Sequence, residues 1–255
     1  MTRDNPKTAL ITGAAKRIGR HLALSLAERG WDIAVHYNSS EADAAEVADE
    51  IRKCGRNAAI LRADLSRENE VAGLIARAAD ALGPLTCLVN NASVFEYDSI
   101  DSATRSGWDT HLETNLRAPF VLTQEFAKAL PADAGGVVVN LIDQRVWNLT
   151  PHFVTYTISK AALWTLTQTL ALALAPRIRV NAIGPGPTLA NTRQTPEQFA
   201  RQCAAMPLRH GASPQDIADA LHYILDAKSM TGQMIALDGG QHLAWCQPAA
   251  IVPEE

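Results

Sequence analysis

The stretch TALITGAAKRIG, residues Thr8–Gly19, decides the fold of this chain. Thr8–Ile11 is an apolar run that predicts a buried strand, and helical periodicity follows at His21–Arg29 and stops at Gly30. A strand, a glycine-rich turn and a helix in this order place backbone N–H groups and a helix N-terminus against a phosphate. We therefore expect a dinucleotide pyrophosphate site rather than an ordinary strand-to-helix turn. Its candidate cofactor-binding residues are Gly13, Arg17, Ile18 and Gly19.

Strands and helices alternate along the rest of the chain, with a period of roughly thirty residues, as in consecutive βαβ units. Apolar runs predict strands at 32–36, 58–62, 86–89, 137–142, 179–183 and 234–237. Periodic segments predict helices at 41–53, 68–81, 153–175 and 214–226. The alternation predicts an α/β fold with a single Rossmann-type, doubly wound parallel sheet and helices on both faces. Such sheets bind ligands at the carboxyl ends of their strands.

The residues that follow the second strand bear on the choice of cofactor. An NAD site usually presents an acidic residue here, which bonds the ribose 2′-hydroxyl. No acidic residue lies between His36 and Ser40, and an acidic residue would repel the 2′-phosphate of NADP. We therefore expect NADPH rather than NADH, with Arg17 as the candidate cation for the phosphate. The candidate residues at this strand end are His36, Asn38, Ser39 and Ser40.

Tyr156 and Lys160 stand at positions i and i+4 in the predicted helix 153–175, so one helical face carries both side chains. Asp143 lies where the preceding strand ends. A nearby ammonium group favours the phenolate and lowers the pKa of a tyrosine from about 10 toward the working pH, as general acid catalysis needs. A tyrosine and a lysine at this spacing occur on many helices without a function, so the pair gains meaning only from the other motifs.

Length and composition restrict the function. The chain of 255 residues is 47% hydrophobic and 20% charged, as is ordinary for a globular protein, and its net charge of −4 argues against a nucleic-acid partner. Residues 161–175 are too short and too polar to cross a bilayer, and the polar start at 1–7 predicts no signal peptide. We expect a cytoplasmic enzyme with a small-molecule substrate, no membrane partner and no metal. The four cysteines lie far apart in the sequence, which fits a reducing compartment and shows no metal-ligand spacing: Cys54, Cys87, Cys203 and Cys246.

Together, the motifs resemble the short-chain dehydrogenase/reductase family over almost the whole chain. The matching segments are Thr12-Gly13-x-x-x-x-Ile18-Gly19, Asp64, Asn90-Asn91-Ala92, Asn115, Tyr156-x-x-x-Lys160, Asn181-x-x-x-Pro185-Gly186 and Leu237-Asp238-Gly239-Gly240. The resemblance implies a nicotinamide dinucleotide cofactor, with Tyr156 as proton donor, Lys160 on the ribose and Asn115 in a proton relay. It also implies cofactor contacts from Asp64, Leu65, Asn91, Ala92, Ser93, Pro185 and Gly186.

The resemblance further implies a layout and an assembly. Residues 1–255 would form a single NADP-binding domain, with a substrate lid at about 187–212 and a C-terminal tail at 241–255. Members of the family are mostly tetramers, and helices at about 108–130 and 153–175 usually form one interface. We therefore expect a homotetramer.

Two departures from the general pattern narrow the resemblance. Arg17 replaces the middle glycine of the turn, and Asp143 occupies the position of the catalytic serine, thirteen residues before Tyr156. Both changes resemble the pteridine reductases and bacterial dihydromonapterin reductases, as do His36-Tyr37 and the motif Asn91-Ala92-Ser93-x-Phe95. In pteridine reductases the phenylalanine of that motif stacks a pterin ring against the nicotinamide. The candidate substrate residues are therefore Phe95 and, from its proximity to Asp143 in the sequence, Trp147.

Asp143 favours one reaction over its alternatives. Reduction of a C=N bond requires a proton on nitrogen, and a carboxyl group bonded to Tyr156 would relay that proton while NADPH supplies hydride. We therefore predict reduction of a dihydropterin-like heterocycle. A second hypothesis is an NADPH-dependent carbonyl reductase of the 3-oxoacyl type, in which Asp143 only replaces serine. A third is an NADP-binding sensor without turnover, against which Tyr156, Lys160 and Asn115 argue.

Overall fold

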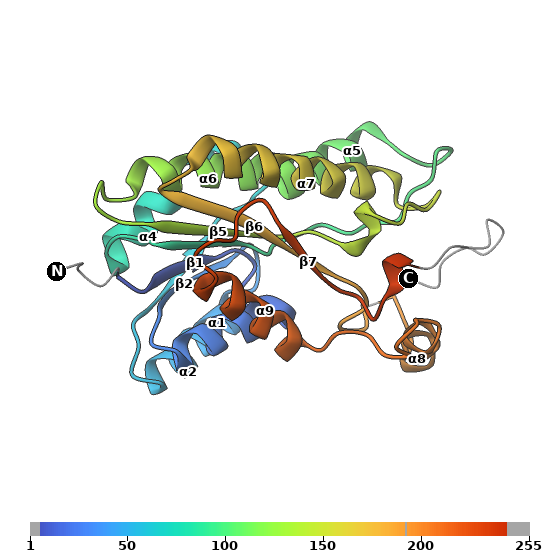
Figure 1. Cartoon of the computed structure of the whole chain (residues 1–255), viewed down its shortest axis with the longest axis horizontal. Coiled ribbons are helices and arrows are strands. Elements are labelled where there is room, and N and C mark those ends of the chain that lie inside the picture. The colour runs from blue at the N-terminus through green and yellow to red at the C-terminus, as the bar shows by residue number, and fades with distance from the viewer. Residues whose placement is uncertain (1–5, 192, 244–255) are drawn as a thin grey trace.

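The computed structural model describes residues 6–191 and 193–243, which contain one seven-stranded sheet (Figure 1). All neighbouring strands are parallel. The order reverses between the first and fourth strands, which is the switch point where such sheets bind ligands. The predicted fold class is confirmed. The strands lie in the order β3 (Ala58–Arg62), β2 (Asp32–Tyr37), β1 (Thr8–Ile11), β4 (Cys87–Asn90), β5 (Gly136–Leu141), β6 (Ile178–Pro185) and β7 (Met234–Leu237).

Helices cover both faces of the sheet (Figure 1). Every residue of β1 is buried, because a strand between two helical layers has no solvent-facing side. Ser213 caps the helix that begins at Pro214 by accepting a hydrogen bond from the Asp216 N–H within a capping box. One face carries α1 (Arg17–Glu28), α2 (Glu41–Lys53) and α9 (Pro214–Asp226). The other carries α4 (Leu74–Leu82), α5 (Arg105–Leu112), α6 (Ala118–Ala129) and α7 (Val154–Leu174).

Two expected helices are interrupted. The helix expected at 68–81 is split into α3 (Glu68–Val71) and α4, with Gly73, a poor helix former, between them. The helix expected at 108–130 is divided by the π-helical segment η1 (Glu113–Arg117) between α5 and α6. Segments of π-helix often occur at functional sites, and this one contains Asn115.

Three short elements lie beyond the carboxyl ends of the strands. They are the 3₁₀ turns η2 (Gln144–Val146) and η3 (Gln241–Leu243) and the helix α8 (Pro196–Ala204), which falls within the segment expected to be a lid (Figure 1). Most of the expected C-terminal tail, residues 244–255, lies outside the described residues. Among the helices in the described ranges, none is long and apolar enough to cross a membrane.

Candidate active site

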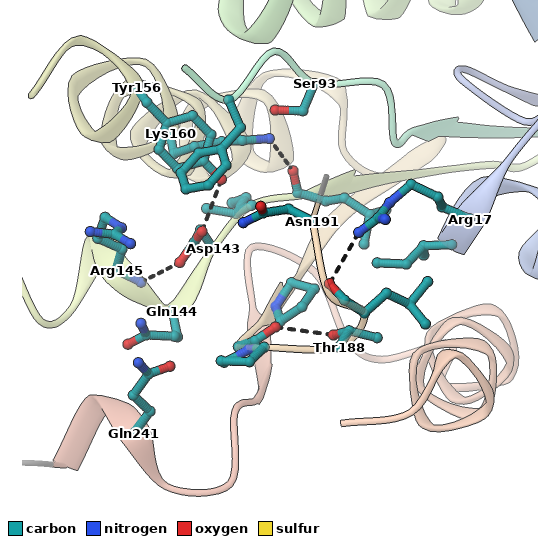
Figure 2. A pocket seen from close by; sticks show the side chains of 18 of the residues that line it. Arg17, Ser93, Asp143, Gln144, Arg145, Tyr156, Lys160, Thr188, Asn191 and Gln241 are labelled. Atoms are coloured by element: carbon teal, nitrogen blue, oxygen red, sulfur yellow. Dashed lines mark hydrogen bonds between the residues drawn. The ribbon is translucent and has the colours of Figure 1, made fainter. Parts of the chain in front are cut away.

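A pocket of about 230 Å³ opens at the carboxyl edge of the sheet (Figure 2). Its wall is formed by the turn between β1 and α1, the loops after β4 and β5, the start of α7, and the chain that follows β6. The pocket brings together many of the residues that the sequence singled out. These are Arg17, Ile18, Asn91, Ser93, Phe95, Asp143, Tyr156, Lys160, Pro185 and Gly186.

Tyr156 and Asp143 meet at the centre of this wall (Figure 2). Tyr156, in the first turn of α7, donates from Oη to Asp143 Oδ2 at 2.9 Å. Asp143 follows β5, and its Oδ1 accepts from the Arg145 N–H at 2.8 Å, which fixes the carboxylate at the start of η2. Lys160 donates from Nζ to the Leu141 carbonyl at 2.8 Å. The end of β5 therefore positions both partners of the tyrosine.

The charge of Lys160 depends on two opposing effects. Burial lowers the pKa of Lys160 from 10.5 to about 8, and the nearby negative charge of Asp143 opposes the shift. The ammonium group therefore persists at neutral pH and is lost in the mildly alkaline range. Its Nζ lies 5.8 Å from the centroid of the Tyr156 ring, close enough for its charge to favour the phenolate.

Asn115 lies behind the pocket, fully buried in η1. Its Oδ1 accepts from the Val94 N–H at 2.8 Å, and its Nδ2 donates to the Val94 carbonyl at 2.9 Å and to Ser159 Oγ at 3.0 Å. Ser159 Oγ donates in turn to the backbone carbonyl of Tyr156 at 2.7 Å. Asn115 thus joins the loop after β4 to the helix that carries Tyr156, without itself belonging to the described pocket wall.

Phe95 supplies an aromatic surface next to Tyr156. Its ring stacks on Phe153 with the centroids 4.4 Å apart and the planes at 11°, and it meets the Tyr156 ring edge-on at 4.6 Å. The guanidinium of Arg193 lies over the Phe95 ring at 5.4 Å from its centroid. The expected substrate residue therefore lines the pocket between the loop after β4 and the segment that precedes α8.

The glycine-rich turn is held by close packing. Gly13 adopts a φ of +63°, and a Cβ on Gly19 would lie 2.2 Å from the Gly13 carbonyl oxygen, so the turn requires glycine at both positions. His36 is buried beneath this turn, where Nδ1 accepts from the Gly13 N–H at 3.0 Å and Nε2 donates to the Ala63 carbonyl at 3.0 Å. Burial lowers the pKa of His36 to about 4, so the ring is neutral. His36 supports the turn from below, whereas the sequence analysis had placed it among the cofactor contacts.

The guanidinium of Arg17, the candidate cation for the 2′-phosphate, makes hydrogen bonds to the segment after β6. Its Nη1 donates to the Ala190 carbonyl at 2.8 Å and its Nη2 to the Leu189 carbonyl at 3.1 Å, so it joins the glycine-rich turn to the segment after β6 (Figure 2). Sequence position alone placed it near β2, because the turn and that strand end are neighbours in this fold. The direction of a long side chain from the turn has no signal in the sequence.

Two other cations flank the end of β2. Arg62, an exposed residue at the end of β3, donates from Nε to the Asn38 carbonyl at 3.2 Å. Lys16, just before α1, forms an ion pair of 3.0 Å with Asp43 in the first turn of α2. Both side chains lie beside the loop of Asn38, Ser39 and Ser40, and the sequence analysis missed both.

Trp147 was expected to line the pocket but packs beside it. Its ring meets those of His242 and Trp164 edge-on, with centroids 5.3 Å and 6.3 Å away, and it is 44% exposed. Asp64 Oδ1 accepts from the Ser66 hydroxyl at 2.7 Å, a bond that lowers the pKa of the carboxyl. In the described part of the chain, the other predicted cofactor residues lie outside the pocket wall: Gly13, Gly19, His36, Asn38, Ser39, Ser40, Asp64, Leu65 and Ala92.

The pocket also contains polar residues that sequence reasoning missed. Gln144 directly follows Asp143, and this adjacency was the only available signal for it. Gln241, after β7, had no signal, because it lies far from the motifs in sequence. Residues 187–212 were expected to form a substrate lid, but no single residue of that segment was predicted. From it, the pocket takes the polar residues Thr188, Asn191, Gln194 and Gln202 and the apolar residues Leu189 and Phe199.

Comparison with known proteins agrees with this architecture. The family model described as enoyl-(acyl carrier protein) reductase matches residues 13–242. The 3-oxoacyl-[acyl-carrier-protein] reductase FabG of Staphylococcus epidermidis is 32% identical over 93% of this chain and 99% of its own length.

Two solved structures are more similar in sequence. FolM alternative dihydrofolate reductase 1 from Brucella suis, in complex with NADP, is 48% identical with a TM-score of 0.92, covering 97% of this chain and 99% of that one. The protein of the same name from Brucella canis, complexed with NADP, is 46% identical with a TM-score of 0.90, covering 95% and 97%. With its parallel sheet and its Tyr156–Lys160 pair at the strand ends, the chain belongs to the short-chain dehydrogenase/reductase family and is an oxidoreductase.

Proposed function

We propose that this chain is an NADPH-dependent reductase that adds hydride to a C=N bond of a dihydropterin-like heterocycle. The observation that carries the proposal is the hydrogen bond of 2.9 Å from Tyr156 Oη to Asp143 Oδ2. A serine at this position would only polarise a carbonyl oxygen. A carboxyl group can take up a proton and pass it to the phenol, which suits a reaction that must place a proton on nitrogen.

The residues around the pocket fit NADPH. The pocket is continuous from Arg17 and Ile18 at the glycine-rich turn to Tyr156 and Lys160, and the N-terminus of α1 offers its N–H groups to a pyrophosphate. Both Brucella FolM structures contain NADP. The cofactor supplies the hydride, and the residues of this chain orient the substrate and deliver the proton.

Each residue of the central wall has a distinct part in that delivery. Tyr156 donates its phenolic proton to the substrate nitrogen, and Asp143 takes up a proton from water and returns it to Tyr156 along their hydrogen bond. Lys160, cationic at neutral pH, stabilises the phenolate between these steps. Phe95 offers an aromatic surface against which a planar heterocycle packs.

The relatives support two substrate classes. Reduction of a dihydropterin or dihydrofolate agrees with the FolM structures, at 46% and 48% identity. A carbonyl reductase agrees with the 3-oxoacyl-[acyl-carrier-protein] reductase relative, at 32%. We favour the first class because Asp143 offers a proton relay that a carbonyl reductase does not need. The sensor hypothesis is weaker, because a protein without turnover has no need of this relay.

Oxidation of NADPH by the purified protein tests the proposal. Dihydropterins and dihydrofolate form one set of substrates, acetoacetyl thioesters and quinones form another, and every assay is repeated with NADH. We expect turnover that is confined to the first set and prefers NADPH. Turnover of carbonyls alone would replace this proposal by the carbonyl reductase, and tight NADPH binding without any turnover would favour the sensor.

We also propose that the chain forms a homotetramer, as the resemblance implies. The helix α7, one of the two expected interface helices, exposes apolar side chains such as Ile158 and Leu172. Burial of such residues between subunits is favourable by roughly 25 cal/mol per Å² of apolar surface. Light scattering after size-exclusion chromatography measures the mass, and a monomer would contradict the assembly.

A further inference from the structure

Gln144 is a buried polar residue of the pocket that the proposed proton relay does not use. It follows Asp143 at the start of η2, lines the pocket and is only 4% exposed. Within residues 6–191 and 193–243, its Oε1 is buried and has no hydrogen-bond partner. A buried polar atom without a hydrogen-bond partner destabilises the folded protein. Proteins retain few such atoms, and a ligand that pairs with the atom explains why this one is kept.

A second carboxamide in the same pocket also has a buried oxygen atom without a hydrogen-bond partner. Gln241 lines the pocket from η3, and its Oε1 is also buried without a partner among the described residues. Its backbone is anchored, because its carbonyl accepts from Asn148 Nδ2 at 3.2 Å. In Figure 2 the side chains of Gln144 and Gln241 lie at the end of the pocket away from Arg17, on the side of Asp143 opposite Tyr156.

The other glutamines of the pocket contrast with this pair. Gln194 Oε1 accepts from the Asn191 N–H at 3.3 Å, and its Nε2 donates to Gln202 Oε1 at 2.9 Å. Gln194 and Gln202 therefore stabilise the segment before α8 and α8 itself. The two carboxamides with unpaired oxygen atoms are concentrated next to Asp143, where a substrate must lie to receive its proton.

We propose that Gln144 determines substrate specificity by hydrogen bonding to an oxygen-bearing group of the substrate, next to the nitrogen that Asp143 and Tyr156 protonate. Gln241 is the second residue of this subsite. The unpaired atom of each glutamine is its amide oxygen, which only accepts, so the substrate group that fits it is a donor such as a hydroxyl group. An alkyl chain pairs with neither glutamine, so the subsite disfavours 3-oxoacyl substrates.

The inference rests on the proposed function and names the part of the substrate that is recognised. In a 7,8-dihydropterin, the nitrogen of the reducible bond is flanked by the ring carbonyl on one side and by the substituent on C6 on the other. The ring carbonyl only accepts, so the partner of Gln144 Oε1 is a hydroxyl group of that substituent. Substrates with and without this hydroxyl group test the assignment.

The variant Gln144→Met tests the inference, because methionine keeps the length of the side chain and removes its hydrogen bonds. We expect the KM for a dihydropterin with a hydroxylated side chain to rise about tenfold or more, since about 1.4 kcal/mol of lost pairing is a factor of ten. We expect the Kd for NADPH to stay unchanged and the thermal melting temperature of the free protein not to fall, because the variant removes a buried oxygen without a partner. The matched control is Gln215→Met, on the exposed surface of α9.

Two substrates identify the partner. One is a dihydropterin with a methyl group at C6, and the other carries a hydroxylated C6 side chain. A rise in KM for the second alone supports pairing with its hydroxyl group, and an equal rise for both contradicts it. An unchanged KM for both substrates in folded Gln144→Met and Gln241→Met overturns the inference while leaving the proposed function intact. A wild-type protein that turns over no dihydropterin overturns both.

Discussion

Tyr156 Oη donates a hydrogen bond of 2.9 Å to Asp143 Oδ2, and different elements fix the two side chains. The Arg145 N–H holds Asp143 at the end of β5. Asp98 holds the start of α7, because its backbone carbonyl accepts from the Phe153 N–H at 2.8 Å and its carboxylate accepts from the Thr155 hydroxyl. The phenol and the carboxyl group are therefore preorganised before any substrate binds, so the reaction does not bear the entropic cost of orienting them.

Loss of the carboxyl group at position 143 should impair the chemical step. In Asp143→Asn the side chain keeps its size but cannot take up a proton and pass it to Tyr156. We expect kcat for a dihydropterin to fall by about 100-fold or more, the usual contribution of a positioned acid or base. Steady-state kinetics with saturating NADPH measures this effect.

Asp143→Ser provides the matched comparison, because serine occupies this position in the general family. We expect it to lose dihydropterin reduction to a similar extent and to retain any carbonyl reduction. The Kd for NADPH, measured by fluorescence, should change little in either variant. Undiminished dihydropterin reduction by Asp143→Ser would show that the carboxyl group carries no proton to the substrate.

The pH dependence of reduction should reflect Lys160. Burial lowers the pKa of this lysine to about 8, so its positive charge is lost as the pH rises through that value. The phenolate of Tyr156 then loses its stabilising cation, and kcat/KM should fall above about pH 8. Because the charge of Asp143 raises the pKa of Lys160, the alkaline fall should move to lower pH in Asp143→Asn. An unmoved or higher alkaline limit in that variant would contradict the assignment to Lys160.

Local patterns were sufficient for the fold and for the centre of the site. Apolar runs and the glycine-rich turn are signals within a few residues, and the helical spacing of Tyr156 and Lys160 fixes their common face. The guanidinium of Arg17 could not be placed in this way, because its carbonyl partners at Leu189 and Ala190 lie more than 170 residues further along the chain. The burial of His36 had no signal either, since β2 is covered on both faces and shows no alternation.

The cations beside the end of β2 should govern the preference for NADPH. Arg62 and Lys16 flank the loop of residues 38–40, where a 2′-phosphate would lie. We expect Arg62→Gln and Lys16→Gln each to raise the KM for NADPH about tenfold and to leave the KM for NADH nearly unchanged. Added salt should reduce this difference, because exposed charges are screened beyond about 8–10 Å at physiological ionic strength. The ratio of kcat/KM for the two cofactors is the measurement.

The variant Arg17→Gln tests whether Arg17, the cation that the sequence favoured, binds the 2′-phosphate instead of Arg62 and Lys16. Its guanidinium bonds the segment after β6, so its loss should raise the KM for the heterocyclic substrate and leave the cofactor ratio unchanged. If the preference for NADPH over NADH is lost in Arg17→Gln but kept in Arg62→Gln and Lys16→Gln, Arg17 and not the other two residues binds the 2′-phosphate.

Stability at mildly acidic pH should depend on His36. Its pKa is about 4 in the folded protein, against 6.5 for a free histidine, so the unfolded chain binds the proton more tightly. The stability due to the neutral ring is complete above about pH 6.5 and is lost as the pH falls toward 4. For this single group, the loss between about pH 7 and about pH 5 is on the order of 2 kcal/mol.

The variant His36→Gln isolates this contribution, because an amide can accept from Gly13 and donate to Ala63 without titrating in this range. Burial also lowers the pKa values of His111 and His222, but both remain in the variant and cancel in the comparison. We expect His36→Gln to be less stable than the wild type at neutral pH and to lose less stability on acidification. Urea unfolding at both pH values measures the difference, and parallel losses in the two proteins would show that His36 is not the titrating group.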